Sequence, residues 1–167
     1  MDHVATKDDL EALFSDRSSF GLSEDATRLP DGEDLDNATA ICRYVRRALG
    51  DRAALYGFLF DDNPTARVSD TLAGGHDFAV VDHRYVVDGW VPFTPSLGIR
   101  QAVFDLTDAA DRAIINRLYG DMSTWERMIS FEDRIDQETS LDREWVMRGT
   151  MFTAPAPDLE APVTPAF

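Results

Sequence analysis

Three side chains in this sequence have the types and the order of a nucleophilic enzyme centre. They are Cys42, which is the only cysteine of the 167 residues, His76, which is one of three histidines, and Asp88. A thiol attacks a carbonyl carbon as its thiolate, an imidazole takes up the thiol proton, and a carboxylate holds the imidazole in one orientation. The order predicts Cys42 as nucleophile, His76 as base and acid, and Asp88 as the orienting group.

The segment GGHDFAVVDHRYVVDGW predicts a β-hairpin that carries His76 and Asp88. The two expected strands, rich in β-branched and aromatic residues, are 76–82 and 85–93. Because side chains alternate between the two faces of a strand, the length of the turn decides whether the pair meets. A three-residue loop at 82–84 places both side chains on one face, whereas a two-residue turn places them on opposite faces. The residue types leave both turns open.

Cys42 lies in the segment DNATAICRYVRRALG, which predicts a helix over residues 36–50 that ends at Gly50. Its start is expected at one of three capping residues, Asp36, Asn37 or Thr39. Near the N-terminal end of a helix, the helix dipole lowers the pKa of a cysteine, and a nearby imidazolium lowers it further. The alternative is structural, because a cysteine on the apolar stripe of a helix is commonly an inert core residue.

This order of elements resembles the papain-like and transglutaminase-like cysteine enzymes. The matching stretches are AICRYVRRALGDRAALYGF, GGHDFAVVD and RYVVDGW, within residues 38–93. The resemblance implies a papain-like or transglutaminase-like core and attack by Cys42 on an amide carbonyl, with His76 as base and acid and Asp88 as orienting group. The sequence departs from the papain type in having no glutamine before the cysteine as an oxyanion donor, and the nearest amide side chain there is Asn37.

The remaining pattern predicts an α+β fold with an antiparallel sheet packed against helices. Further expected elements are a helix over 6–14, strands at 53–60 and 99–106, and a helix that is capped by Thr107 and ends at Gly120. Within residues 122–150, the segment TWERMISFEDRI suits either a strand or a helix, and the following segment DQETSLDREWVMRG predicts a helix. We expect one domain over residues 1–152 and a proline-rich extended tail over 153–167.

The amino-acid composition limits the classes of molecule that we expect this chain to bind. The net charge of −15 and the pI near 4.4 argue against direct binding to nucleic acid, because phosphates require a basic surface. We expect no membrane segment, no metal and no cofactor, and a cytoplasmic protein, since a lone cysteine offers no internal disulfide. An acidic surface that imitates DNA remains open.

Two functional hypotheses follow from the sequence. The first is a small intracellular cysteine hydrolase or acyltransferase that acts on a peptide or side-chain amide through Cys42, His76 and Asp88. The alternative is a catalytically silent domain of the same fold that binds a protein partner through its acidic surface, and a DNA mimic is one form of this alternative.

Overall fold

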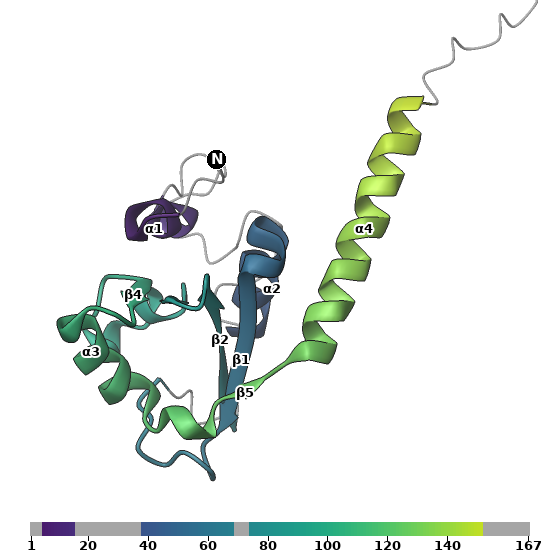
Figure 1. Ribbon diagram of the computed structural model, residues 1–167. Coiled ribbons are helices and arrows are strands. Elements are labelled where there is room, and N and C mark those ends of the chain that lie inside the picture. Colours follow the sequence, from purple (N-terminus) through teal and green to yellow (C-terminus); the bar gives the residue numbers. More distant parts are fainter. Residues whose placement is uncertain (1–4, 16–37, 69–73, 152–167) are drawn as a thin grey trace, which may run out of the picture.

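The computed structural model describes residues 5–15, 38–68 and 74–151, which form an α+β arrangement (Figure 1). The α-helices in these residues are α1 (Lys7–Ser15), α2 (Ala38–Leu49), α3 (Ala109–Tyr119) and α4 (Ile129–Met151). The strands are β1 (Ala53–Leu59), β2 (Gly75–Val81), β3 (Tyr85–Val87), β4 (Val103–Asp105) and β5 (Glu126–Arg127). The predicted tail at 153–167 and the predicted helix start at 36–37 lie outside the described residues.

The strands form one antiparallel sheet in the order β4-β3-β2-β1-β5. The predicted hairpin is present, and its loop has three residues because Val81 pairs with Tyr85. Asp82 and His83 hold left-handed backbone angles in that loop, with φ of 51° and 55°. This region disfavours most side chains, but Asp and His tolerate it better than β-branched residues do. The alternative two-residue turn is thereby excluded.

The second strand of the hairpin is shorter than predicted. It ends at Val87, whereas the sequence pattern suggested residue 93. Beyond it, the Asp88 N–H still donates to the Ala102 carbonyl, but the Asp88 side chain accepts a hydrogen bond from the Trp90 N–H at 3.0 Å. This local bond replaces a ladder bond, so the chain turns into a short 3₁₀ helix at Val91–Phe93.

The predicted helices are present among the described residues, but the predicted N-terminal cap of α3 is wrong. Thr107 was the expected cap of α3, but Asp108 fills that position and accepts a hydrogen bond from the Asp111 N–H at 2.9 Å. Gly120 ends α3, as predicted, with φ of 61°. The ambiguous segment after residue 122 contains both elements, since the two-residue β5 precedes α4.

Helices cover both faces of the sheet, and each face has its own apolar cluster. The α2-face cluster includes Leu10, Cys42, Val45, Leu55, Ala79, Val81, Val87 and Ile135, from α1, α2, α4 and the strands. The α3-face cluster includes Phe58, Phe78, Val80, Val86, Phe104, Ile115, Leu118 and Tyr119. Neighbouring residues of β2 alternate between the clusters, as the period of a strand requires. Figure 1 shows α2 and α3 on opposite sides of β1 and β2.

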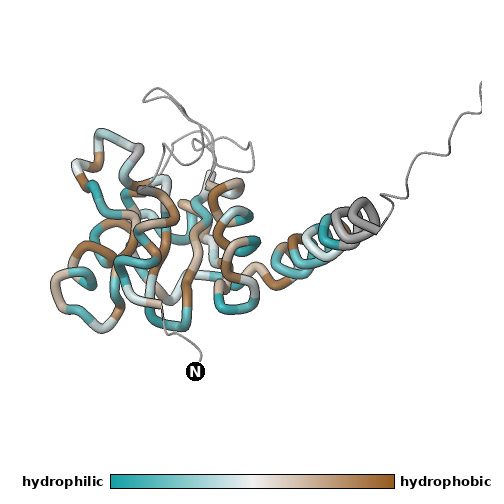
Figure 2. Tube along the Cα trace, turned by 90° about the horizontal axis from the view of Figure 1, so that it is seen from above, coloured by the Kyte–Doolittle hydropathy of each residue, from teal (hydrophilic) through white to brown (hydrophobic). Residues whose placement is uncertain are grey.

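Hydrogen bonds join the first turns of α4 to α2, and the rest of the helix extends away from the sheet (Figures 1 and 2). Arg46 of α2 donates to both carboxylate oxygens of Asp136 at 2.8 and 2.5 Å and to the Ala53 carbonyl at 2.8 Å. Glu132 accepts a hydrogen bond from the Leu55 N–H at 2.7 Å. In the described part of the chain, no helix combines the length and the apolar content needed to cross a membrane.

Candidate functional site

His76 and Asp88 meet in the folded chain. His76 is the second residue of β2, and Asp88 follows β3 on the same face of the hairpin as a consequence of the three-residue loop. The Nε2 atom of His76 and the Oδ2 atom of Asp88 lie 2.7 Å apart. Both residues are buried, with exposed fractions of 4% and 1%. The carboxylate can therefore fix the orientation of the imidazole, as the sequence suggested.

The Asp88 carboxylate receives two further hydrogen bonds. The Tyr119 hydroxyl donates to Oδ2 at 2.8 Å, and the Trp90 N–H donates to Oδ1 at 3.0 Å. Burial raises the pKa of Tyr119 well above its ordinary value, and the charge of Asp88 raises it further, so the hydroxyl remains a donor. Three donors compensate for the loss of water around this buried carboxylate. Sequence reasoning missed Tyr119, because only the packing of α3 brings it to the hairpin.

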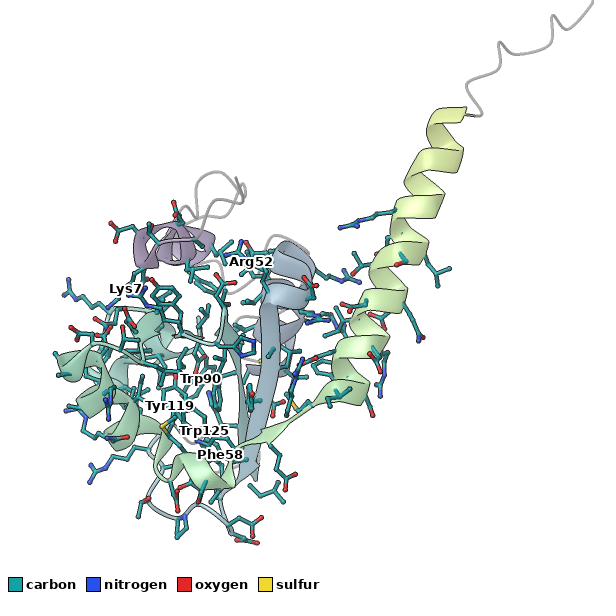
Figure 3. The ribbon with its side chains drawn as sticks, in the orientation of Figure 1. Lys7, Arg52, Phe58, Trp90, Tyr119 and Trp125 are labelled. Atoms are coloured by element: carbon teal, nitrogen blue, oxygen red, sulfur yellow. The ribbon has the colours of Figure 1, made fainter. Side chains whose placement is uncertain are left out.

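Aromatic rings surround the imidazole of His76. The ring centroids of Trp90 and Tyr119 lie 5.2 and 6.1 Å from that of His76, and those of Phe58 and Phe78 lie 6.4 and 6.5 Å away. In Figure 3, Trp90, Tyr119 and Phe58 gather in the interior beside the sheet. Among the described residues, no hydrogen bond reaches the second ring nitrogen, Nδ1, so this atom remains available to a ligand.

Cys42 lies on the other side of the sheet from the imidazole. Its side chain belongs to the α2-face cluster with Ala79 and Val81, whereas the His76 ring packs against Phe78. Within the described part of the chain, no hydrogen bond joins the sulfur to His76. The structure thus brings two of the three predicted residues together and places the third in an apolar core.

The surroundings of Cys42 favour the neutral thiol. The side chain is 1% exposed, and this burial raises the pKa of the thiol well above its ordinary value. The negative charges of Asp77 and Asp88 raise the pKa further. Cys42 also lies in the second turn of α2, because that helix is already formed at Ala38. The expected activation by the helix dipole is weaker here than at the first turn.

A cleft of about 550 Å³ opens at the end of the sheet next to the N-terminus of α2. It is lined by Ala38, Thr39, Gly57, Phe58, Leu59, Asp62, Gly75, His76, Asp77, Trp90, Thr124, Glu126 and Met128. Three of these side chains are carboxylates, and none is lysine or arginine. The Thr39 hydroxyl donates to Oδ2 of Asp77 at 2.8 Å. Cys42 is not among the residues that line the cleft.

No family model, curated protein or solved structure matches the chain. The site is therefore interpreted from its own geometry. In the described residues, no three histidine, cysteine, aspartate or glutamate side chains are grouped as metal ligands. The groups available for chemistry at this site are the oriented imidazole of His76, the neutral hydroxyl of Tyr119 and the carboxylates of the cleft.

Proposed function

We propose that this chain is a catalytically silent domain that binds a basic protein partner through its acidic surface. The observation that carries the proposal is the position of Cys42, which the sheet separates from the imidazole of His76. Thiol chemistry requires a thiolate in contact with the substrate, whereas this thiol is buried and its pKa is raised. The cleft next to His76 offers acceptors for a ligand but no nucleophilic sulfur.

The choice of a basic partner rests on charge. A net charge of −15 over 167 residues produces a negative field that attracts basic surfaces and repels nucleic acid. Such a field speeds the encounter of oppositely charged proteins and makes their affinity depend on salt. The carboxylates of Asp62, Asp77 and Glu126 concentrate this charge at the cleft. A DNA-like surface is one form that this function can take.

Thiol labelling tests the silent character of the domain. We expect iodoacetamide at pH 6 to modify Cys42 only after denaturation, because the folded chain holds the sulfur in its core as a neutral thiol. The same labelling on a His76→Ala variant is the matched comparison. Rapid labelling of the native protein that is lost in His76→Ala would overturn the proposal, because it would show a thiolate paired with the imidazole.

Salt dependence tests the binding function. The probe is a fluorescent peptide of alternating arginine and serine, and the control is the same peptide with citrulline in place of arginine. We expect the arginine peptide to bind and to weaken by roughly tenfold or more between low and physiological salt. An affinity that is indifferent to salt, or equal for the citrulline peptide, would contradict an electrostatic partner.

The second candidate is a cysteine hydrolase or acyltransferase with a papain-like or transglutaminase-like core. The hydrogen bond between His76 and Asp88 favours it, since an oriented imidazole is the base that such an enzyme needs. This candidate requires the sulfur of Cys42 to reach the imidazole in another conformation. The thiol-labelling experiment distinguishes it from the silent domain.

A further inference from the structure

The helix α1 covers the outer edge of the sheet at β4 (Figure 1). One oxygen of the Glu11 carboxylate accepts hydrogen bonds from the N–H groups of Ala102 and Val103 at 2.9 and 2.8 Å. A further strand would place its carbonyl groups at such donors, so this carboxylate takes the place of a strand. On the same helix, the Lys7 ammonium donates to the Asp111 carboxylate of α3 at 2.6 Å. These polar contacts hold α1 against β4 and α3.

Neighbouring amides of β4 depend on different elements for their hydrogen bonds. The Leu106 N–H donates to the Arg84 carbonyl at 2.8 Å, beside the paired residues Phe104 and Val86. Because hydrogen-bonded pairs alternate along an antiparallel ladder, Phe104 and Val86 form the next such pair. The Val103 N–H points away from β3 and donates to α1. The Val103 amide therefore reports on the docking of α1, whereas the Phe104 amide reports on the sheet.

α1 has little buried surface of its own to hold it in place. Its nine residues are fewer than the about 12–15 that an isolated helix needs for marginal stability in water, so docking is what keeps it helical. Between residues 7 and 14, where the structure describes the burial, only Leu10 is buried, with an exposed fraction of 1%. Elements with few buried contacts open at a lower free energy than the core does. α1 is therefore suited to leave the sheet while the strands stay paired.

The last turns of α1 reach the segment that carries Trp90. The Phe14 ring lies directly on the backbone of Gly89, because a Cβ at that position would clash with the ring. Phe14 and Trp90 also pack against the same two buried residues of α2. Trp90 lines the cleft, and its ring centroid lies 5.2 Å from that of His76. A continuous set of contacts thus joins α1 to a wall of the cleft.

We infer that α1 is a strap that opens independently of the sheet, and that its docking holds Gly89 and Trp90 in the position that forms one wall of the cleft. Opening removes Phe14 from Gly89 and exposes the Val103 N–H to water. The inference goes beyond the proposed function, because it concerns how the cleft is shaped and holds whatever the cleft binds. A partner that binds more tightly in one state of α1 would shift the chain toward that state.

Native-state hydrogen exchange of the full chain tests the independent opening. We expect the protection factor of the Val103 amide to be at least about tenfold lower than that of the Phe104 amide. Its dependence on low urea concentrations should also be weaker, because opening α1 exposes less surface than unfolding the sheet. Glu11→Gln removes the charged acceptor and should lower Val103 protection by about tenfold, whereas Asp8→Asn, at an exposed position of the same helix, should change it less than about twofold.

A variant of the sheet separates the two kinds of opening. Ile115 is 0% exposed and packs in the α3-face cluster with Phe104. Ile115→Val removes one buried methyl group, so it should lower the protection of the Phe104 amide by about fivefold. Because the contacts of Ile115 persist when α1 alone opens, the protection of the Val103 amide should change less than about twofold.

The coupling to the cleft is tested by holding the strap open. Leu10→Asp places a charge at the buried position of α1, and Ala12→Asp, which adds the same charge at an exposed position, is the matched control. We expect Leu10→Asp to shift the indole N–H NMR signal of Trp90 while the Phe104 amide stays protected, and Ala12→Asp to leave this signal in place. The indole of Trp125, which donates to the Tyr119 carbonyl within the α3-face cluster, is the internal reference.

Three results would overturn the inference. The first is Val103 protection that equals that of Phe104 or falls with it in Ile115→Val, because α1 would then open only together with the sheet. The second is a loss of Phe104 protection in Leu10→Asp, because α1 would then be part of the folded core. The third is a Trp90 signal that Leu10→Asp leaves in place, because the docking of α1 would then not position the wall of the cleft.

Discussion

Replacing Asp88 by asparagine should destabilise the fold strongly, although the two side chains have the same shape. The carboxylate accepts hydrogen bonds from His76, Tyr119 and the Trp90 N–H, and it is 1% exposed. An asparagine has one acceptor oxygen, so one donor faces an NH₂ group and loses its partner, which costs about 1–3 kcal/mol. The remaining bonds lose the charged acceptor and about half of their strength. We expect a total cost of about 3–5 kcal/mol.

Urea unfolding, followed by tryptophan fluorescence and checked by circular dichroism, measures this cost. Tyr119→Phe removes one donor and keeps the ring, so it should cost about 1.5–3 kcal/mol, less than Asp88→Asn. Asp61→Asn changes an exposed carboxylate and should stay within about 0.5 kcal/mol of the parent chain. If Asp88→Asn costs no more than Asp61→Asn at an unchanged urea slope, the three hydrogen bonds do not stabilise the fold as reasoned.

Two further predictions concern charged groups away from the cleft. The Arg84 guanidinium holds the pKa of Asp105 far below its usual range. A carboxyl whose pKa is lower in the folded state stabilises the fold above the ordinary aspartate pKa of about 4, and this stabilisation is lost as the pH falls toward the folded pKa. We therefore expect the urea midpoint to decline below about pH 4, and to decline less in the Asp105→Asn variant. Arg46 is buried, pairs with Asp136 and donates to the buried Ala53 carbonyl, and Arg46→Met should cost about 1–3 kcal/mol, because that carbonyl loses its donor while Glu132 keeps the Arg127 guanidinium at 3.1 Å. An Asp136→Asn variant, whose carboxylate is 46% exposed, should lose clearly less in the same urea titration, and an equal loss would contradict the assigned role of Arg46.

The hairpin was accessible from the sequence because local rules determine its strands, but its pairing was not, since the residue types left a two-residue and a three-residue turn open. The alternation of apolar residues placed both strands, and Asp82 and His83 were the residue types that a left-handed loop tolerates. The approach of His76 to Asp88 then followed from the length of that loop. The α+β class followed in the same way from the order of the expected helices and strands.

The position of Cys42 could not be read from local pattern. The apolar stripe of α2 shows which side of the helix is buried, but it does not show which face of the sheet the helix covers. That choice depends on tertiary packing, and it put the sulfur and the imidazole of His76 on opposite faces. Tyr119 was inaccessible for a related reason, since a buried tyrosine at the end of a helix looks like any core aromatic until its hydroxyl finds Asp88.

The division of the interior into two clusters also bears on how substitutions combine. Side chains of the α2-face cluster, such as Val45, share few contacts with those of the α3-face cluster, such as Ile115. The free-energy effects of changes at distant sites without common partners usually add. Repacking around Val45 should therefore leave the arrangement around His76 intact, whereas Ala40 and Ile41 of α2 pack against Trp90 beside His76, so an engineer who adjusts the durability of the domain should leave those two positions unchanged.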